Sequence, residues 1–474
     1  MQLSVTISRW LKDIRFWILL FALLRLYGIT NPPVEVAHSW RQTTVAMTAR
    51  NFLEVDPDIL YPRIDIGGDL SGITGMEFPL FNYLIFLMCR LFGFAHWYGR
   101  LINLVVSSLG CLFFYKLLRR FFAHRVAFCS TFILLVSLWF SYSRKIMPDT
   151  FSLSLVIMGM YFGMQYLTRP RHSLLPLLLY ALFSLAGVLS KLPSGYLLVL
   201  FAIPFFSPAV HTKRKVWFAV LSLLICIPVG LWYFYWVPQL VSRYGLEHFF
   251  MGKGIAEGAR ELAANMPLTL KHFYDYALKY IGFALFAAGL IYAFLRKEWK
   301  LLAVTGLSLL AFAAVMLKAG WTFAHHVYYI LPFVPVMSLV AGFAVASVHK
   351  KWLFTLLLAA VALENILNQH SDFIIRPDRQ AIVQLEQVMD TLSQPSDLIV
   401  VNSGEDPTPV YFAHRKGWVA YNNQLADPAY LQSLANHGCR YVIILKQVFG
   451  TDINLPLTPL FSDPNYTVYA LNTP

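Results

Sequence analysis

Charged residues are scarce in this 474-residue sequence and make up only 13% of it. Soluble proteins have about a quarter of their residues charged, so this composition excludes an ordinary soluble fold for the whole chain. Hydrophobic residues instead account for 58% of the chain and aromatic residues for 16%. Apolar runs long enough to cross roughly 30 Å of hydrocarbon recur almost to residue 370, which predicts a polytopic helical membrane protein.

Cysteine is also rare, and its placement argues against disulfide or zinc chemistry. The five cysteines are Cys89, Cys111, Cys129, Cys226 and Cys439, and none has the spacing of a metal site. Only Cys439 lies in the C-terminal region that we predict to be soluble, so that region cannot hold an internal disulfide. The sequence also contains no internal repeat and no low-complexity segment.

Acidic residues are outnumbered, because 25 Asp and Glu against 38 Lys and Arg give a formal net charge of +13. The cations fall between the apolar runs rather than on one soluble face, which argues against nucleic acid as a partner. The basic clusters are Lys12/Arg15, Lys116/Arg119/Arg120/Arg125, Arg169/Arg171, Lys213/Arg214/Lys215, Arg296/Lys297/Lys300 and Lys350/Lys351. They alternate with loops poorer in basic residues, so the excess charge is mainly a signal of membrane topology.

The apolar runs predict about eleven transmembrane helices. Their approximate ranges are 15–31, 98–117, 126–142, 150–168, 173–190, 194–208, 216–237, 276–295, 301–318, 326–348 and 352–368. The first run lacks a small-residue cleavage site, so we expect it to be retained. The apolar segment 78–94 contains Arg90 and is expected to lie in the membrane interface. This count predicts a multi-pass protein of the plasma (inner) membrane, with a cytoplasmic N-terminus and the C-terminal tail outside.

The composition changes near residue 370. Residues 398–401 and 440–445 are predicted to form short strands, with a helix between them at 430–435. Strand, helix and strand in this order indicate a small α/β domain. We therefore expect a transmembrane domain at 1–369, with a long outside loop at 32–77, and an extracytoplasmic α/β domain at 370–474.

The long outside loop is unusually polar for this chain. His38, Trp40, Arg41 and Gln42 fall within five consecutive positions. A membrane protein does not need such a loop merely to cross the bilayer, whereas an enzyme that acts on a polar headgroup does. We expect these residues, together with Arg63, to bind substrate.

Three carboxylates, Glu35, Glu77 and Asp149, stand at the predicted outer ends of apolar segments. Ionisable groups at such depths are expensive and tend to be functional, so these three are the candidates for a catalytic base. There is a structural alternative. Asp149 follows Pro148, and Glu77 precedes another proline-containing helix start, so either carboxylate could instead cap a helix.

Cations and imidazoles are predicted on the same side of the membrane, and the candidates for substrate binding are Arg144, Lys191, Lys318, His325 and His326. Lys191 interrupts a tight hydrophobic hairpin, which fits either phosphate binding or snorkelling to the interface. Each histidine could instead serve as a hydrogen-bonding group at the interface. Adjacent histidines do not form a His-x-x-x-His metal pair. The sequence therefore identifies no certain cofactor, although carboxylates with histidines allow a divalent metal.

These features resemble the GT-C superfamily of membrane glycosyltransferases, and especially the branch that contains the protein O-mannosyltransferases and the lipid A aminoarabinose transferase. The likeness covers residues 10–370 in architecture but only short motifs in sequence. The motifs are His38-Ser-Trp-Arg-Gln42 with Ala49-Arg-Asn-Phe52, Glu77-Phe-Pro-Leu80, Met147-Pro-Asp149, Lys191 and His326-Val-Tyr-Tyr-Ile-Leu-Pro-Phe-Val-Pro335.

The resemblance implies a GT-C-like bundle that transfers a sugar from a polyprenyl-phosphate donor to an acceptor lipid, glycan or protein outside the cytoplasm, with inversion. Such a reaction needs a base for the acceptor proton and a cation for the departing phosphate. We expect Asp149 or Glu77 to be the base, and Lys191, Arg41 and His326 to bind the phosphate. We also expect the outside loop to form one wall of the cavity that holds these groups.

One departure from the family keeps alternatives open. The family usually has an acidic pair early in the first loop, where this chain has Arg41-Gln42-Thr43-Thr44. Glu35, Glu77 or Asp149 must then supply the base, or the protein is a non-catalytic envelope assembly protein. A transporter or lipid flippase is the other alternative, but such proteins often carry repeats and ionisable groups near the bilayer midplane. Within the enzyme class, a polymerase or ligase of lipid-linked glycans also fits.

Overall fold

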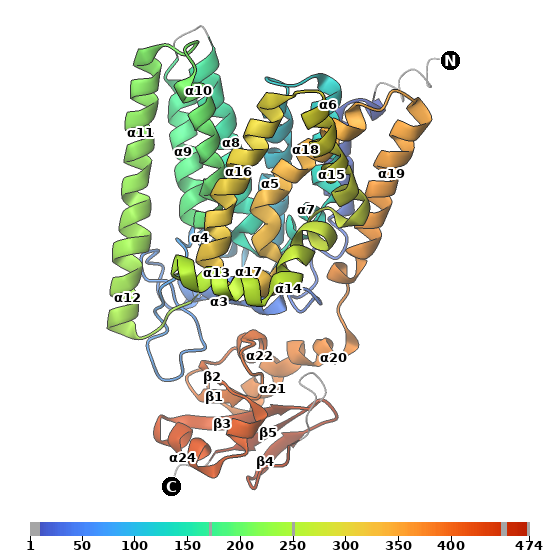
Figure 1. The fold of residues 1–474 in the computed structure, drawn as a ribbon. Helices are drawn as coiled ribbons and strands as arrows, with labels where there is room; N and C mark the ends of the chain where they lie inside the picture. The colour runs from blue at the N-terminus through green and yellow to red at the C-terminus, as the bar shows by residue number, and fades with distance from the viewer. Residues whose placement is uncertain (1–9, 170–172, 249–251, 447–452, 472–474) are drawn as a thin grey trace. The chain divides into compact units, whose positions relative to one another are not determined.

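The computed structural model describes residues 10–169, 173–248, 252–446 and 453–471 (Figure 1). The chain divides into two compact units. The bundle unit comprises Met1–Ile29, Arg100–Tyr233 and Phe250–His370, and the mixed unit comprises Thr30–Gly99, Phe234–Phe249 and Ser371–Pro474.

Helices make up the described part of the bundle unit, because its segments are too apolar to leave backbone groups unpaired in lipid. Many of the longer helices run side by side (Figure 1). The helices that lie in this unit, or begin or end in it, are α2 (Ile14–Leu24), α5 (Trp97–Leu118), α6 (His124–Val136), α7 (Trp139–Tyr142), α8 (Pro148–Thr168), α9 (Leu175–Ser190), η1 (Leu192–Phe201), α10 (Ala202–Phe206), α11 (Thr212–Gly230), η2 (Leu231–Trp236), α13 (Ile255–Ala264), α14 (Met266–Lys271), η3 (His272–Ala277), α15 (Lys279–Leu295), α16 (Trp299–Ala319), α17 (Trp321–His325), η4 (Val327–Phe333), α18 (Val334–Ala346), α19 (Lys351–Asn368) and η5 (His370–Phe373).

Among the described residues, six helical stretches are long and apolar enough to cross a membrane, or seven if a bent pair counts as one span. Shorter apolar helices of 10–17 residues account for further predicted spans. The number of long spans is lower than the roughly eleven predicted because some apolar runs divide into separate helices. The hydropathy of the sequence does not show where a helix breaks. The predicted span 126–142, for example, divides at Ser137 into α6 and α7. The predicted interfacial segment forms α4 (Leu80–Phe92), whose 13 residues fall short of the roughly 20 that a span needs.

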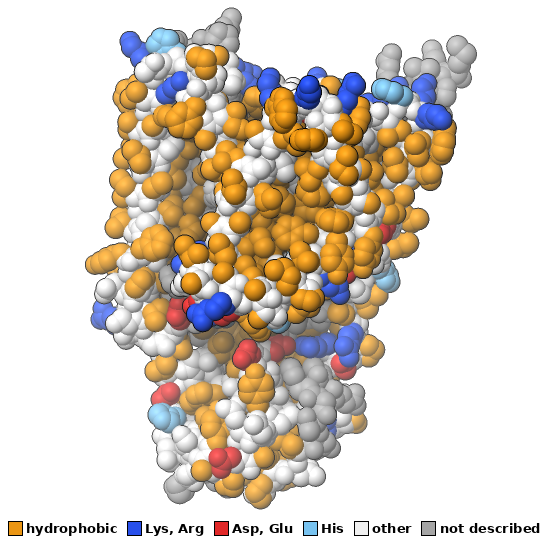
Figure 2. Space-filling model, viewed as in Figure 1, with side chains coloured by type: hydrophobic (Ala, Val, Ile, Leu, Met, Phe, Trp, Pro, Cys, Tyr) orange, Lys and Arg blue, Asp and Glu red, His pale blue; other side chains and the backbone are white. Residues whose placement is uncertain are grey.

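The surface of the bundle unit agrees with a membrane protein. Hydrophobic side chains cover the flanks of its helices, and Lys and Arg side chains gather at the end near α10 and the start of α19 (Figure 2). Large apolar residues such as Leu223, Leu310 and Phe294 are strongly exposed on these flanks. The predicted class, a polytopic helical membrane protein with a small sheet-containing part, is confirmed.

Helices α8 and α9 pack closely, and Gly187 makes this approach possible. A Cβ atom at Gly187 would lie 2.9 Å from the carbonyl oxygen of Ser152 on α8. The Ser152 hydroxyl donates a hydrogen bond to the Gly187 carbonyl at 2.7 Å. Small residues of this kind let membrane helices approach closely. The contact fixes the start of α8 beside the end of α9.

The mixed unit contains a five-stranded sheet in the order β2-β1-β3-β5-β4. Strand β1 pairs in parallel with β2 and β3, while β5 pairs antiparallel with β3 and β4. The elements that lie wholly in it are α3 (Ser39–Glu54), α4, α12 (Val237–Tyr244), α20 (Pro377–Gln380), η6 (Ala381–Gln384), α21 (Leu385–Leu392), β1 (Leu398–Val401), α22 (Thr408–Ala413), β2 (Gly417–Val419), α23 (Asn422–Leu425), α24 (Pro428–Asn436), β3 (Cys439–Leu445), β4 (Pro459–Ser462) and β5 (Tyr466–Ala470).

One hydrophobic cluster joins the predicted outside loop to the sheet. Met47 of α3 and Ile64 pack in the same cluster as Leu385 of α21, Ile399 of β1 and Ile443 of β3. The loop is therefore a structured part of the mixed unit.

Candidate active site

Asp149 and Lys191 form a buried ion pair in the bundle unit. Lys191 Nζ lies 2.7 Å from Asp149 Oδ1, and their side chains are only 8% and 3% exposed. Asp149 stands in the first turn of α8, after Pro148, where the helix dipole favours a negative charge. Lys191 ends α9 with extended backbone, at the close α8–α9 contact that Gly187 permits. The packing of two apolar helices thus places opposite charges together.

Asp149 does not serve as the helix cap. The N-cap residue of α8 is Met147, and no side chain caps this end. Among the described residues, Asp149 Oδ2 is buried without a hydrogen-bond partner. Removing two charges from water costs several kcal/mol per ion before their attraction offsets it, so a buried pair is weak evidence for a stabilising role. An ionisable pair at such a position instead favours a functional role.

Aromatic rings surround the ammonium of Lys191. Its Nζ lies 4.9 Å from the centre of the Tyr328 ring and 5.6 Å from that of Tyr329. His326 stacks on Tyr328 with a centroid distance of 5.5 Å. His326 and Lys191 therefore contact the same tyrosine, at the start of η4. The two tyrosines occur in the family-like motif, but sequence analysis did not select them as site residues.

Lys318 and His325 are engaged away from this ion pair. Lys318 Nζ donates a hydrogen bond to the Lys253 carbonyl at 2.6 Å, on the exposed surface. His325 stacks on Trp321 with a centroid distance of 4.0 Å, and its Nδ1 lies 2.9 Å from the Trp321 carbonyl oxygen. In these contacts both side chains serve the local structure around α17.

Arg144 belongs to a second buried group in the bundle unit, and it donates to the Gly28 carbonyl at 2.8 Å. Arg100 donates to the Ile29 carbonyl at 3.1 Å, and Arg25 donates to the hydroxyl of Ser143. The side chains of Arg25 and Arg100 are fully buried. Sequence analysis missed these two arginines, although an ionisable residue in an apolar run is a functional signal by itself.

The mixed unit holds the other candidate carboxylates. Arg41, on α3, forms an ion pair with Glu77, and both residues are buried. Glu35 and Gln42 are also buried. His38 precedes α3 with φ 57°, a left-handed conformation, and it makes no side-chain cap bond.

Two further predicted residues lie in this unit. The Trp40 ring lies edge-on to His38 with a centroid distance of 6.4 Å. Arg63 pairs instead with Asp56 at 3.1 Å. Arg41 and Glu77, both predicted site residues, are thus brought together in the mixed unit.

Helix α3 is polar yet almost wholly buried, because its side chains find partners within the mixed unit. Asn51 donates to Asp65 Oδ1 at 2.8 Å, and Arg50 lies 3.4 Å from Asp65 Oδ2. Burial raises the pKa of Asp65, although Arg50 and Asn51 act to lower it. Buried polar groups need such partners, and these contacts allow the polar side chains of the helix to be buried.

His248 is another residue that sequence analysis did not select. Burial lowers its pKa well below the ordinary value, and the charge of Arg41 lowers it further. A neutral imidazole therefore accompanies the Arg41–Glu77 pair. Among the residues that the structure describes, no group of three or more His, Cys, Asp and Glu side chains is arranged to hold a metal ion.

Comparison with known proteins gives this geometry a context. Residues 77–232 match the family of dolichyl-phosphate-mannose-protein mannosyltransferases. This range is less than half of the chain, but it contains Glu77, Asp149 and Lys191. No curated protein sequence matches the chain significantly.

Solved structures resemble almost the whole chain. ArnT from Cupriavidus metallidurans, bound to undecaprenyl phosphate, is 15% identical with a TM-score of 0.61, covering 96% of this chain and 98% of ArnT. The apo state of the same protein matches with a TM-score of 0.60. The archaeal oligosaccharyltransferase AglB from Archaeoglobus fulgidus, in complex with an inhibitory peptide and a dolichol-phosphate, is 14% identical with a TM-score of 0.57, covering 91% of this chain and 69% of AglB. The resemblance to the GT-C superfamily is therefore confirmed at the level of the fold.

Proposed function

We propose that this GT-C-fold membrane protein is a glycosyltransferase that moves a sugar from a polyprenyl-phosphate donor to an acceptor glycan, lipid or protein, with inversion. The observation that carries the proposal is the buried Asp149–Lys191 pair beside two tyrosine rings. Two proteins of the same fold were solved with undecaprenyl phosphate and with a dolichol-phosphate, which supports a polyprenyl-phosphate ligand here.

The ends of α8 support the membrane orientation that we propose. Asp149 stands in its first turn, whereas Arg169 caps its last turn, within one of the basic clusters. Because basic clusters stay in the cytoplasm, Asp149 and Lys191 face the opposite side of the plasma (inner) membrane. The N-terminus is then cytoplasmic, and the domain at 370–474 extracytoplasmic.

The two members of the ion pair have different roles in the proposed reaction. Lys191 places a positive charge where the donor phosphate departs, which stabilises the developing negative charge. Asp149 accepts the proton of the acceptor hydroxyl or amine, with Oδ2 as the accepting atom. The rings of Tyr328 and Tyr329 contact the Lys191 ammonium without carrying a charge of their own. Because inversion puts the base and the departing phosphate on opposite faces of the sugar, Lys191 moves from Asp149 to the phosphate when the donor binds.

The Arg41–Glu77 pair is the second candidate centre, with Glu35 as a further carboxylate. The guanidinium of an arginine can donate two parallel hydrogen bonds to a phosphate. Arg41 is therefore suited to binding a phosphate or pyrophosphate group. We assign binding to this pair, with Trp40 and Gln42 shaping the sugar site. Glu77 then keeps Arg41 in position.

A non-catalytic assembly protein or a flippase would share the fold without requiring a base. The discriminating assay uses the purified full chain with polyprenyl-phosphate sugars of several kinds, with and without acceptor extracts. We expect cleavage of the donor only when an acceptor is present.

Three variants complete the assay. Asp149→Asn should lose transfer by roughly 100-fold to 10,000-fold, as expected for a missing general base. Glu77→Gln tests the alternative base, and Glu257→Gln, which alters an exposed pair with Lys253, is the matched control. Wild-type transfer by both Asp149→Asn and Glu77→Gln would overturn the catalytic assignment.

A further inference from the structure

A large pocket lies within the bundle unit, and it extends along α8 away from the Asp149–Lys191 pair. Its volume is about 970 Å³, at the upper end of typical ligand pockets. The walls come from α5, α8, η1, α10, α11, α16 and α18. Helix α8 connects the two regions, because Asp149 is in its first turn while Thr168, its last residue, lines the pocket. Along the helix axis, Asp149 is roughly 12 Å from Ile157, the nearest lining residue of α8, and roughly 30 Å from Thr168 at the far end of the pocket.

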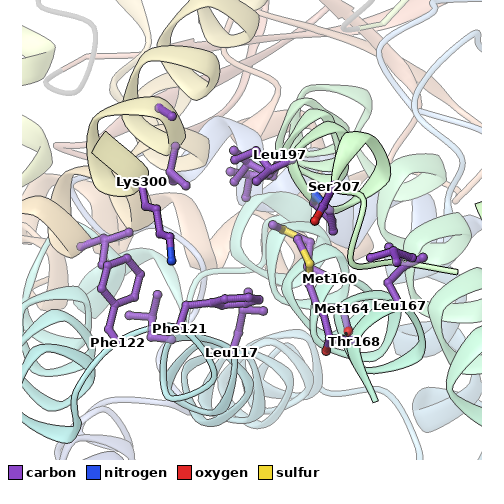
Figure 3. Close-up of a pocket in the computed structure, with 18 of the residues that line it drawn as sticks. Leu117, Phe121, Phe122, Met160, Met164, Leu167, Thr168, Leu197, Ser207 and Lys300 are labelled. Carbon is purple, nitrogen blue, oxygen red and sulfur yellow. Dashed lines mark hydrogen bonds between the residues drawn. The ribbon is translucent and has the colours of Figure 1, made fainter. Parts of the chain in front are cut away.

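The walls of the pocket are apolar. Figure 3 shows Leu117 and Phe121 on one side and Leu197, Met160 and Met164 on the other. Methionine side chains are flexible and polarisable, so they adapt to ligands of variable shape. An aliphatic chain suits such walls, whereas a sugar would find few hydrogen-bond partners.

Basic groups collect at one end of the same pocket. Arg169 caps α8, His211 caps the start of α11, and Lys300 lies in the first turn of α16; all three line the pocket. Lys300 extends from its helix into the pocket beside Phe121 and Phe122 (Figure 3). No Asp or Glu is among the described residues that line it.

Arg214 adds a fourth basic group, which is held in place. It lies on α11, is only 7% exposed, and donates to the carbonyl oxygens of Tyr166 and Arg169. The pocket therefore combines an aliphatic interior with a preorganised cationic end.

We propose that this pocket binds one anionic phospholipid, with an acyl chain along the apolar walls and the phosphate at Arg169, Arg214 and Lys300. The far end of a polyprenyl chain is neutral hydrocarbon and would not need these cations. Charge complementarity therefore selects a lipid with an anionic headgroup. The basic end belongs to clusters that we assign to the cytoplasm, where the leaflet carries anionic lipids and basic pockets between helices bind their headgroups.

The test measures lipid binding by native mass spectrometry on the delipidated full chain in detergent. Phosphatidylglycerol and phosphatidylcholine are supplied at equal concentration. We expect the wild type to retain one phosphatidylglycerol in preference to phosphatidylcholine. The double variant Arg169→Gln/Lys300→Gln should bind phosphatidylglycerol roughly 25-fold more weakly, at about fivefold for each cation near a membrane surface.

Two further variants keep the result interpretable. Lys351→Gln removes a cation that does not line the pocket, and it should retain wild-type binding. Met164→Trp fills the interior of the pocket and leaves its cations intact. It should weaken the binding of phosphatidylglycerol. The proposal is overturned by equal retention of both phospholipids, by an unchanged affinity in the double variant, or by competitive displacement of phosphatidylglycerol by undecaprenyl phosphate. The readout is independent of sugar transfer, so the proposed enzymatic function can stand or fall separately.

Discussion

The Asp149–Lys191 pair and the Glu77–Arg41 pair differ in the cation that each employs. In the bundle unit, Asp149 pairs with a lysine, whose ammonium also faces two tyrosine rings. In the mixed unit, Glu77 pairs with Arg41 on a polar, buried helix. Lysine is a compact point charge on a flexible stem, whereas the guanidinium of arginine is planar and rigid.

This difference between the two cations indicates that the two ion pairs have different roles. A lysine can move its charge toward an incoming phosphate and release the carboxylate for proton transfer. The planar arginine is better suited to holding a ligand in one orientation. We therefore infer that the bundle pair carries the chemistry and that the mixed pair carries the binding geometry. Variants of the two pairs should separate these roles.

Lys191→Met should cause the largest combined loss of transfer and stability. It removes the cation for the departing phosphate, so transfer should fall by roughly 100-fold to 1,000-fold. It also leaves Asp149 buried without its partner, which costs about 3–5 kcal/mol of stability. Transfer assays and thermal unfolding in detergent measure the two effects. Lys253→Met, at an exposed pair, is the control, and an equal loss of stability there would contradict the account.

Asp149→Asn/Lys191→Met separates stability from function. With both charges gone, no uncompensated buried charge remains, so most of the stability lost in Lys191→Met should return. Transfer should remain absent. If the double variant were no more stable than Lys191→Met, the loss would come from packing rather than from the unpaired carboxylate.

Arg41→Lys should have a smaller effect, because it keeps the charge beside Glu77 but removes the planar fork. We expect transfer to fall by roughly 10-fold to 100-fold through misplaced substrate, with KM rising more than kcat falls. Steady-state kinetics with varied donor concentration would reveal this. A loss confined to kcat would contradict the assignment of Arg41 to binding.

A partly exposed cluster around His414 should give the smallest effect. His414 contacts Glu54 at 2.9 Å and Glu386 at 2.6 Å. The hydrogen bonds to these carboxylates raise the pKa of His414, although burial and Arg50 act to lower it. A raised folded-state pKa contributes stability below pH of about 6.5, and this stability is lost as pH rises through the folded-state value.

The mixed unit should therefore lose about 0.2–1 kcal/mol of stability for each such pair on going from pH 6 to pH 8. Thermal unfolding of wild type and His414→Gln at several pH values measures the change. The variant should lack this part of the pH dependence. An identical pH dependence in both proteins would remove His414 from the explanation.

Much of the fold could be predicted from the sequence, because the length of the apolar runs and the positions of the basic clusters indicate membrane helices directly. Strands β1 and β3 were also predicted, since Leu398–Val401 and Cys439–Leu445 are short apolar runs. Strands β2 and β4 were not, because Gly417–Val419 and Pro459–Ser462 are short, and half or more of their residues are partly exposed or exposed. Their place in the sheet depends on long-range pairing.

The site was predicted less completely. Asp149 and Lys191 were selected as isolated signals, and their 2.7 Å contact depends on the close approach of α8 and α9 that Gly187 permits. No spacing rule links positions 149 and 191. Arg25 and Arg100 were missed because each is a single charged residue among apolar neighbours. His248 was missed because its proximity to Arg41 arises only in the folded mixed unit.

The most direct test of the central claim measures two quantities on one preparation of Asp149→Asn: the rate of sugar transfer and the affinity for undecaprenyl phosphate. We expect transfer to fall by more than about 100-fold, because the base is missing. We also expect undecaprenyl phosphate to bind as tightly as to the wild type or more tightly, because Lys191 remains and a negative charge is gone. Wild-type transfer, or loss of binding together with transfer, would contradict the claim that Asp149 supplies the base while Lys191 binds the phosphate.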